Sequence, residues 1–419
     1  MTRISKEVWV AAGLRTPFAK ADKELKDIDA IKMSVTVLNK MNQSEGLNPD
    51  YVVWGTVLPN LDYSNIGREA ILESELPEET IGLSTTLACS TSLTAAIQAA
   101  LMISDDEVAI AGGVESMSNV QLGLSASTSR WLRTLPSQKG IFNKIIHFFS
   151  GLINFRLYIP KGVNRKTGKS MGQHAEITAQ RLGVTREEQD RLALSSHENY
   201  FSAADGGFYE DLITPAFGLE KDAIPRRKTN LEKLATLKPV FDKKSGKGTL
   251  TAGNSSLFTD GAAGVWIAGK NKIGDINTPY KARLVDWEMA GVNIEKEGIL
   301  MSPTFAIPKL LERHGLTYDD IDVWEIHEAF ASQVLATIKN LEDPAHLKKT
   351  GVTMPLGKFP LQKLNMNGSS ISIGHPFGAT GARILSQTVK ELHRLGPGKK
   401  ALISTCADGG LGTIALVEN

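Results

Sequence analysis

The sequence predicts an α/β protein built from two similar halves. In the first half, a loop leads into an apolar helix over residues 93–103, then a buried strand over 107–111 and a Gly-Gly pair. In the second half, a loop leads into a helix over 378–395, then a buried strand over 400–405 and another Gly-rich turn. Buried helices beside short apolar strands indicate layers of helix and parallel sheet. One recurrence in each half also argues against a solenoid, whose period is about 20–50 residues.

Composition describes an ordinary globular protein. Its 419 residues are enough for two to four domains of about 100–200 residues each. The 47 Lys and Arg nearly balance the 46 Asp and Glu, so charge gives no reason to expect a nucleic-acid partner. No stretch reaches about 18 uninterrupted apolar residues, so no transmembrane helix is expected. We expect a cytoplasmic location, because the first strand begins at Val8 without room for a cleavable leader and because two cysteines suit a reducing compartment.

Four reactive side chains lie at ends of the expected elements. Cys89 precedes a helix, where free amides and the helix dipole favour a thiolate, and Ser90 and its neighbours can cap that helix. His375 also precedes a helix, and His327 follows a strand over 323–326. Cys406 ends a strand in a Gly-rich turn, which can present N–H groups to an oxyanion.

Each of these residues has a structural alternative. A free cysteine is most often simply buried, and a loop histidine is more often a hydrogen-bonded structural residue than a ligand. The strand ends of an α/β sheet, however, are where such proteins carry their sites. Four reactive residues at four such positions therefore favour an active site over any single structural explanation.

The motifs around these residues resemble those of the thiolase family, in the family's order. The resemblance runs from about residue 7 to the last strand. The matching segments are Arg15-Thr16-Pro17-Phe18, Cys89 with its Ser/Thr-rich helix start, Ala111-Gly112-Gly113-Val114-Glu115-Ser116-Met117-Ser118, Gly253-Asn254-Ser255-Ser256 with Asp260-Gly261-Ala262-Ala263, His327-Glu328-Ala329-Phe330, Asn367-Gly368, Gly374-His375-Pro376-Phe377-Gly378-Ala379-Thr380-Gly381-Ala382-Arg383 and Cys406 with Gly409-Gly410-Leu411-Gly412.

The resemblance implies a reaction and a role for each residue. A thiolase cysteine takes an acyl group from a 3-ketoacyl-CoA as a thioester, and a second CoA releases it. Cys89 matches that nucleophile, His375 the base that activates it, and Cys406 the thiol that exchanges a proton with the acetyl-CoA carbanion. The resemblance also implies an enolate pocket made by His375 and a water held at His327. A second oxyanion pocket would use the backbone N–H groups of Cys89 and Asp408.

Two positions depart from the commonest thiolase pattern. His327 stands where many thiolases have Asn, which resembles the β-subunit of the fatty-acid oxidation trifunctional complex; the segment 300–308 is also similar to that branch. Asp408 stands where the family usually has Gly or Ala. A carboxylate there would oppose negative charge in the oxyanion pocket unless it points away.

The resemblance assigns further positions to CoA and implies no cofactor. Ala252, Ser256, Ala329 and Phe330 match positions that line the pantetheine channel of thiolases. Coenzyme A itself is a substrate. The sequence shows no metal-ligand spacing, so no metal is expected.

The implied architecture is the thiolase fold, with two similar α/β halves in a layered αβαβα arrangement and an inserted loop domain. The N-terminal half would comprise residues 1–118 and 248–275, the loop domain 119–247, and the C-terminal half 276–419. Residues 119–169 contain nine Lys or Arg and no Asp or Glu, and 141–153 form a basic amphipathic pattern. Such a helix either packs on its own domain, docks on a partner or lies on an anionic membrane, here through residues 130–160.

The expected function is thiolytic cleavage of a 3-ketoacyl-CoA by CoA in fatty-acid β-oxidation, through an acyl-Cys89 intermediate. Two alternatives stay open: an acetyl-CoA C-acetyltransferase that makes acetoacetyl-CoA, and an inactive acyl-CoA-binding subunit. Family and size indicate a homodimer, or a heterotetramer with a hydratase/dehydrogenase α-subunit.

Overall fold

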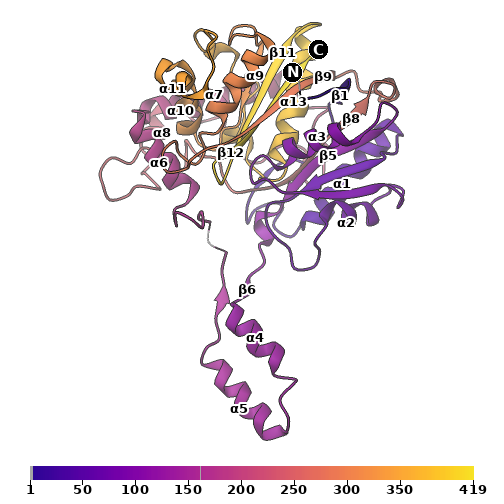
Figure 1. The fold of residues 1–419 in the computed structure, drawn as a ribbon, viewed down its shortest axis with the longest axis vertical. Coiled ribbons are helices and arrows are strands. Elements are labelled where there is room, and N and C mark those ends of the chain that lie inside the picture. Colours follow the sequence, from indigo (N-terminus) through magenta and orange to yellow (C-terminus); the bar gives the residue numbers. More distant parts are fainter. Residues whose placement is uncertain (1–2, 161) are drawn as a thin grey trace.

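One continuous mixed sheet runs through both halves of the molecule (Figure 1). The computed structural model describes residues 3–160 and 162–419. Along the sheet the strands follow the order β10-β11-β12-β9-β1-β8-β5-β3-β4, and β2 pairs with β8. Their bounds are β1 Val8–Ala11, β2 Ala19–Lys20, β3 Tyr51–Gly55, β4 Ile81–Thr85, β5 Val108–Glu115, β8 Thr259–Gly269, β9 Lys281–Gly291, β10 Val323–Ile326, β11 Lys400–Ala407 and β12 Leu411–Glu418.

The strand pairing repeats from one half to the other, which confirms the two similar halves. The parallel pair β3–β5 corresponds to β10–β11, and the antiparallel pairs β5–β8 and β8–β1 correspond to β11–β12 and β12–β9. Antiparallel pairing of β1 with β9 joins the halves. The expectation of parallel strands holds only for the outer strands. A three-residue turn over 408–410 joins β11 to β12, and so short a connection permits only antiparallel pairing.

Helices cover the sheet in layers and enclose apolar cores, of which three are the largest. The helices are α1 Ala30–Glu45, α2 Ile66–Leu72, α3 Thr91–Met102, α4 Ala126–Thr134, α5 Ile141–Leu152, α6 Met171–Arg181, α7 Arg186–Asp205, α8 Leu231–Ala235, α9 Pro303–His314, α10 Ala331–Glu342, α11 Pro344–Thr350, α12 Ser370–Ile373 and α13 Thr380–Leu395. One core contains α3 and α13 between the two halves of the sheet; α1 and α2 close the second core, and α9 and α10 the third. This is the expected αβαβα layering.

Because side chains alternate along a strand, a single strand contributes residues to two of these cores. In β5, Ala109 and Ala111 belong to the central core, whereas Val108 and Ile110 belong to the core under α1. Because successive strand residues point to opposite faces, a strand buried on both faces is apolar throughout. That is why the sequence reads here as a continuous apolar run.

The two central helices, α3 and α13, pack so closely that their backbones are in contact. A Cβ on Gly381 of α13 would lie 2.3 Å from the backbone nitrogen of Leu93 in α3. The N–H of Ala382 donates to the hydroxyl of Ser92 at 2.9 Å. The contact brings the starts of α3 and α13, and the loops that precede them, to the same place in the molecule.

Ser90 holds the start of α3 in a different way from the one expected. Its side chain makes no N-cap hydrogen bond. Instead, its hydroxyl lies 3.0 Å from the carbonyl oxygen of Thr405 and 2.7 Å from the hydroxyl of Thr405. The hydroxyl therefore ties the loop of Cys89 to the strand that carries Cys406.

A helical hairpin projects away from the layered body (Figure 1). It comprises α4, α5 and the two-stranded ribbon of β6 (Gly123–Leu124) and β7 (Leu157–Tyr158). Inside it, Trp131 donates to the carbonyl oxygen of His147 at 2.8 Å and its ring contacts Phe148. The outer apolar side chains are exposed: Ile141, Phe142, Ile145, Ile146, Phe149, Leu152 and Ile153. Among the alternatives for 141–153, packing of the whole apolar face on its own domain is therefore wrong.

Among the described residues, no helix has the length and apolar content needed to cross a bilayer.

The backbone approach at Gly381 predicts a stability effect. Gly381→Ala places a methyl group against the backbone of Leu93, so we expect overpacking to lower the free energy of unfolding by about 1–3 kcal/mol. Urea denaturation of the variant measures this. Gly274→Ala is the matched control, because its Cβ would meet nothing within 4 Å. Equal stability of the two variants would contradict the prediction.

Candidate active site

Cys89 and His375 meet where the two central helices begin. The Sγ atom of Cys89 lies 3.1 Å from Nε2 of His375, although 286 positions separate them in the chain. Ala88 has φ 45°, so Cys89 follows a left-handed residue in the sharp turn between β4 and α3. Left-handed backbone is unfavourable for a residue with a Cβ and is retained mostly at functional positions. The turn directs the thiol toward the loop that carries His375.

Thr380 sets the proton position on His375. The Thr380 hydroxyl lies 2.6 Å from Nδ1 of His375 and donates its hydrogen to the carbonyl oxygen of Pro376 at 2.9 Å. Because the hydroxyl has one hydrogen, its oxygen accepts from His375 Nδ1–H. In a neutral imidazole the other nitrogen then has the lone pair. Nε2 of His375 therefore faces the thiol of Cys89 as a base.

His327 adds a second imidazole to the pair. Its Nε2 lies 3.2 Å from Nε2 of His375, and its Nδ1 lies 2.9 Å from the hydroxyl of Ser370. Asn365 holds the end of β10 beside it: the amide accepts from the N–H of Ile326 at 2.9 Å and donates to the carboxylate of Glu328 at 2.7 Å. The expectation that these three reactive residues share one site is met.

Burial keeps the side chains of Cys89, His375 and His327 uncharged. It lowers the pKa of His375 to about 3 and that of His327 well below its usual value, with nearby positive charge from Arg383 adding to the effect on both. Burial also raises the pKa of Cys89, and Cys406 and Asp408 raise it further. The expected bias toward a thiolate at the helix start is therefore wrong, because the loss of solvation raises the pKa of this thiol. The site holds a neutral thiol beside a neutral base.

Cys406 is a protonated thiol at the end of β11. Burial raises its pKa to about 12. The strand ends at Ala407, and Gly409 and Gly410 both have positive φ in the turn that follows. The sequence placed Cys406 at such a turn, and the structure agrees. The contacts of Ser90 with Thr405 place the loop of Cys89 beside this strand, and Cys406 raises the pKa of Cys89.

The side chain of Asp408 is held by the segment that returns from the hairpin. Its carboxylate accepts a hydrogen bond from Nδ2 of Asn164 at 2.9 Å. Asn164 also accepts from the N–H groups of Lys166 and Thr167, so it organises that turn. The carboxylate thus has a hydrogen-bond partner outside the turn 408–410, while its charge still raises the pKa of Cys89.

Glu115 anchors the loop of His375 to the N-terminal half. Its carboxylate accepts hydrogen bonds from the Thr56 hydroxyl, from the N–H groups of Val57 and Leu58 and from the N–H of Gly378. Burial raises its pKa to about 7, and these bonds oppose the rise. A Cβ on Gly113 would lie 2.3 Å from the carbonyl oxygen of Gly378, so only Gly permits the approach.

The four positions assigned to CoA lie in two adjoining loops. Ser256 donates from its hydroxyl and its N–H to the carbonyl oxygen of Ala329, at 2.9 and 3.0 Å. Ser255 forms a β-bridge with Phe330. Ala252 is exposed, whereas Ala329 and Phe330 are buried. Their role toward CoA stays a prediction.

Three of the groups could in principle ligate a metal. The ligand atoms of Cys89, His327 and His375 lie within 4.8 Å of one another. Their closest contacts, 3.1 and 3.2 Å, are hydrogen-bond distances. The absence of a metal remains an expectation.

Sequence reasoning missed the residues that orient the catalytic groups. Thr380, Ser370 and Glu115 had no role assigned, although Thr380 and Glu115 lie inside quoted motifs. Phe258 is exposed beside the site, 6.0 Å from the ring of Phe377, which in turn contacts His375. A charged residue at the end of the otherwise apolar strand β5 was the available signal for Glu115. Only the folded chain identifies Thr380 and Ser370.

The fold repeats one α/β unit in two halves, and the site pairs a cysteine thiol with a neutral imidazole where the two central helices begin. Models of the thiolase N-terminal domain and of the thiolase C-terminal domain match residues 8–271 and 278–419. The chain belongs to the thiolase family.

Named relatives cover the whole chain. The 3-ketoacyl-CoA thiolase of Vibrio cholerae serotype O1 is 34% identical over 100% of this chain and 98% of its own length. A crystal structure of human mitochondrial 3-ketoacyl-CoA thiolase in complex with CoA has TM-score 0.81 and 29% identity, over 99% of this chain and 98% of that one. The Bacillus anthracis acetyl-CoA acetyltransferase has TM-score 0.80 and 32% identity, with the same coverage.

The neutral thiol predicts how Cys89 reacts with iodoacetamide. Because its pKa is raised well above 9.0, we expect the alkylation rate to keep rising with pH beyond about pH 9. Asp408→Asn removes a negative charge but keeps an acceptor for Asn164, so it should raise the rate at any given pH. Peptide mass spectrometry separates alkylation at Cys89 from that at Cys406. A rate that levels off below pH 8, or one that Asp408→Asn leaves unchanged, would contradict this account.

Proposed function

We propose that this protein cleaves 3-ketoacyl-CoA with CoA to give acetyl-CoA and a shortened acyl-CoA. The contact of 3.1 Å between His375 Nε2 and Cys89 Sγ carries the proposal, because it pairs a nucleophile with a base directly. The family and the full-length 3-ketoacyl-CoA thiolase relatives support it.

In the first half-reaction, Cys89 Sγ attacks the 3-keto carbon while His375 Nε2 takes the thiol proton. The bond between C2 and C3 then breaks, which leaves an acyl thioester on Cys89 and the enolate of acetyl-CoA. Cys406 protonates C2 of that enolate, and acetyl-CoA leaves. A thiol with a pKa of about 12 is fully protonated at neutral pH and is therefore able to act as the acid.

In the second half-reaction, Cys406 is a thiolate and takes the proton of the incoming CoA thiol. The CoA sulfur attacks the acyl-Cys89 thioester, and the tetrahedral intermediate collapses to acyl-CoA. The sulfur of Cys89 leaves and recovers its proton from His375. Backbone N–H groups of Cys89 and Asp408 are the proposed donors to the oxyanion of the tetrahedral intermediate. The cycle restores both thiols, so it needs no cofactor.

Two other functions remain candidates. Condensation of two acetyl-CoA molecules to acetoacetyl-CoA uses the same groups in reverse, and the similarity to an acetyl-CoA acetyltransferase favours it. An inactive acyl-CoA-binding subunit has Asp408 and the basic insert at residues 119–169 in its favour, and the hydrogen bond from Asn164 to the Asp408 carboxylate weakens the first of these.

Thiolysis of substrates from about four to about sixteen carbons separates these functions. We expect activity that rises with chain length and that falls by about 10²–10⁴-fold or more in Cys89→Ala, because removal of the nucleophile removes the covalent path. The rate is measured from the absorbance of the enolate form of the 3-ketoacyl-CoA substrate, which falls as the substrate is cleaved. Activity confined to four carbons would favour the acetyltransferase. No activity at any length would contradict both enzymes and favour the binding subunit.

The proposed assembly is a homodimer formed at β4. This strand ends the sheet order, and Ile81 and Leu83 on it are 49% and 36% exposed. An edge strand with exposed apolar side chains favours pairing with a second copy. A heterotetramer with a hydratase/dehydrogenase α-subunit would build on this dimer.

Light scattering tests the dimer. Ile81→Lys combined with Leu83→Lys should shift the mass toward that of one 45.4 kDa chain, because the charges oppose burial at the edge. Leu395→Lys, on an exposed position at the end of α13, is the control. A dimer that persists in the double variant would place the interface elsewhere.

The hairpin is proposed to contact an anionic membrane surface. Phe142 and Ile153 are 78% and 86% exposed, and residues 119–169 carry basic charge without acidic charge. Apolar side chains beside Lys and Arg fit an interface of acyl chains and anionic headgroups. The site residues lie in the layered body, so the hairpin is separate from the chemistry. The cytoplasmic location, peripheral to a membrane, follows as part of this proposal.

Vesicle flotation tests the hairpin. Wild-type protein should float with vesicles that contain anionic lipid, and should bind less to neutral vesicles and at high salt. Phe142→Ser combined with Ile146→Ser and Phe149→Ser should abolish flotation and leave thiolysis in solution unchanged. Asn143→Ser on the same helix is the control. Equal flotation of the triple variant would contradict the proposal, and binding to neither vesicle would favour a protein partner.

A further inference from the structure

Ser370 connects a buried arginine to the second histidine of the site. Its hydroxyl oxygen lies 2.8 Å from Nη2 of Arg383 and 2.9 Å from Nδ1 of His327. Ser370 begins α12, and Arg383 lies near the start of α13, so both flank the loop that carries His375. Arg383, Ser370 and His327 form a chain of hydrogen bonds, and all three residues are buried.

The hydrogens in this chain can be assigned from the groups themselves. A guanidinium has only donors, so the Ser370 oxygen accepts from Arg383. The Ser370 hydroxyl then has its hydrogen free for Nδ1 of His327, the acceptor within reach. Burial, His375 and Arg383 lower the pKa of His327, so the ring is neutral. A neutral imidazole that accepts at Nδ1 carries its hydrogen on Nε2.

His327 and His375 are thus held in opposite tautomers. His375 carries its hydrogen on Nδ1 and has a lone pair at Nε2, whereas His327 carries its hydrogen on Nε2, 3.2 Å from that lone pair. A donor and a base therefore face the same space beside Cys89. His327 is fixed as a donor before substrate arrives, which is how an oxyanion site avoids reorganisation during the reaction.

We infer that Ser370, supported by Arg383, is a positioning residue that holds His327 as an Nε2–H donor toward the substrate oxygen, directly or through one water. The inference rests on the proposed function, because the acceptor is the thioester oxygen of the acetyl-CoA enolate. Ser370 touches neither substrate nor thiol and acts through His327 alone.

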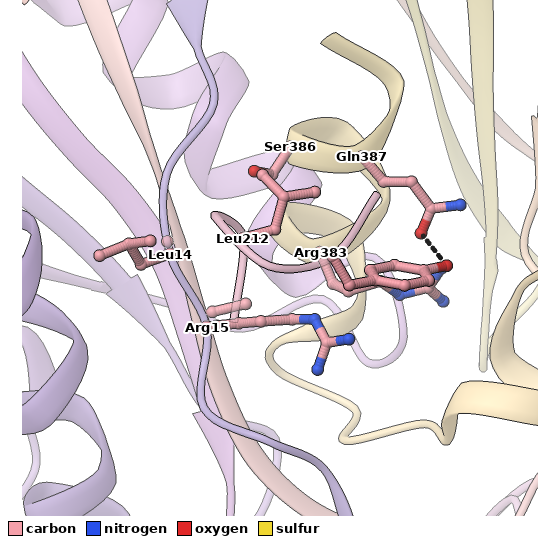
Figure 2. A pocket seen from close by; sticks show the side chains of 9 residues that line it. Leu14, Arg15, Leu212, Arg383, Ser386 and Gln387 are labelled. Atoms are coloured by element: carbon pink, nitrogen blue, oxygen red, sulfur yellow. Dashed lines mark hydrogen bonds between the residues drawn. The ribbon is translucent and has the colours of Figure 1, made fainter. Parts of the chain in front are cut away.

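The surroundings of Arg383 explain why the arginine stays in place. Figure 2 shows Arg383, Ser386 and Gln387 of α13 across a cavity from Arg15. The cavity has about 10 Å³ of space, near the minimum for one water and far too little for an acyl chain. Nε of Arg383 has no hydrogen-bond partner among the described residues. Burial lowers the pKa of Arg383, and attraction to Glu325 and Glu328 opposes that shift, although burial also raises the pKa of Glu325 to about 8.

Steady-state kinetics of four variants tests the inference. Ser370→Ala should lower kcat/KM by about tenfold or more, less than the ~10²–10³-fold typical for loss of an oxyanion donor itself. In a His327→Asn background the same change should cost less than about twofold, because an amide donates without a tautomer to fix. Ser369→Ala is the matched control: its hydroxyl also lies beside Arg383, at 3.5 Å, and it has no contact with His327. An equal cost of Ser370→Ala in both backgrounds would overturn the inference.

Histidine ¹⁵N NMR provides a readout that does not depend on activity. The His327 signals, assigned by difference from His327→Asn, should report Nε2–H in the wild type and in Ser369→Ala, and a tautomer mixture in Ser370→Ala. An unchanged tautomer in Ser370→Ala would overturn the inference even if activity falls. An inactive wild type with the expected tautomers would instead count against the proposed function alone.

Discussion

The site depends on the close contact of α3 and α13. Gly381 lets the backbone of α13 lie against Leu93, and Gly113 and Gly378 let the loop before α13 lie against β5. Because the starts of both helices are fixed by this contact, Cys89 and His375 meet at hydrogen-bond distance without any local sequence relation. Larger side chains at these glycines would separate the pair, so the same residues determine both packing and chemistry.

Burial determines the charge state of the site as strongly as the packing determines its geometry. The helix dipole at α3 favours a thiolate, yet loss of solvation and the neighbouring groups raise the pKa of Cys89. His375 stays unprotonated for the same reason. The thiol and the imidazole are therefore both neutral at rest, and charge would form only when the thiol attacks a substrate.

The sequence predicted the repeated halves, the layering and the four reactive residues, because apolar periodicity and motifs are local properties. Strand direction was predicted only in part, since short turns such as 408–410 decide it. The contact between Cys89 and His375 spans 286 positions, and the bond from Asn164 to Asp408 spans 244, so neither has a local signal. The thiolate expectation failed because burial of a single sulfur depends on the whole fold. Ser370 could not be identified from the sequence, because its role depends on contacts with Arg383, 13 positions away, and with His327, 43 positions away.

The most direct test of the account is the mass of the protein after mixing with a 3-ketoacyl-CoA in the absence of free CoA. We predict one acyl group on Cys89, located by peptide mass spectrometry, that disappears when CoA is added. In His375→Gln the rate of its formation should fall by about 10²–10⁴-fold, because the imidazole that lies 3.1 Å from the thiol is removed. An acyl group on Cys406, or a rate that His375→Gln leaves unchanged, would contradict the account.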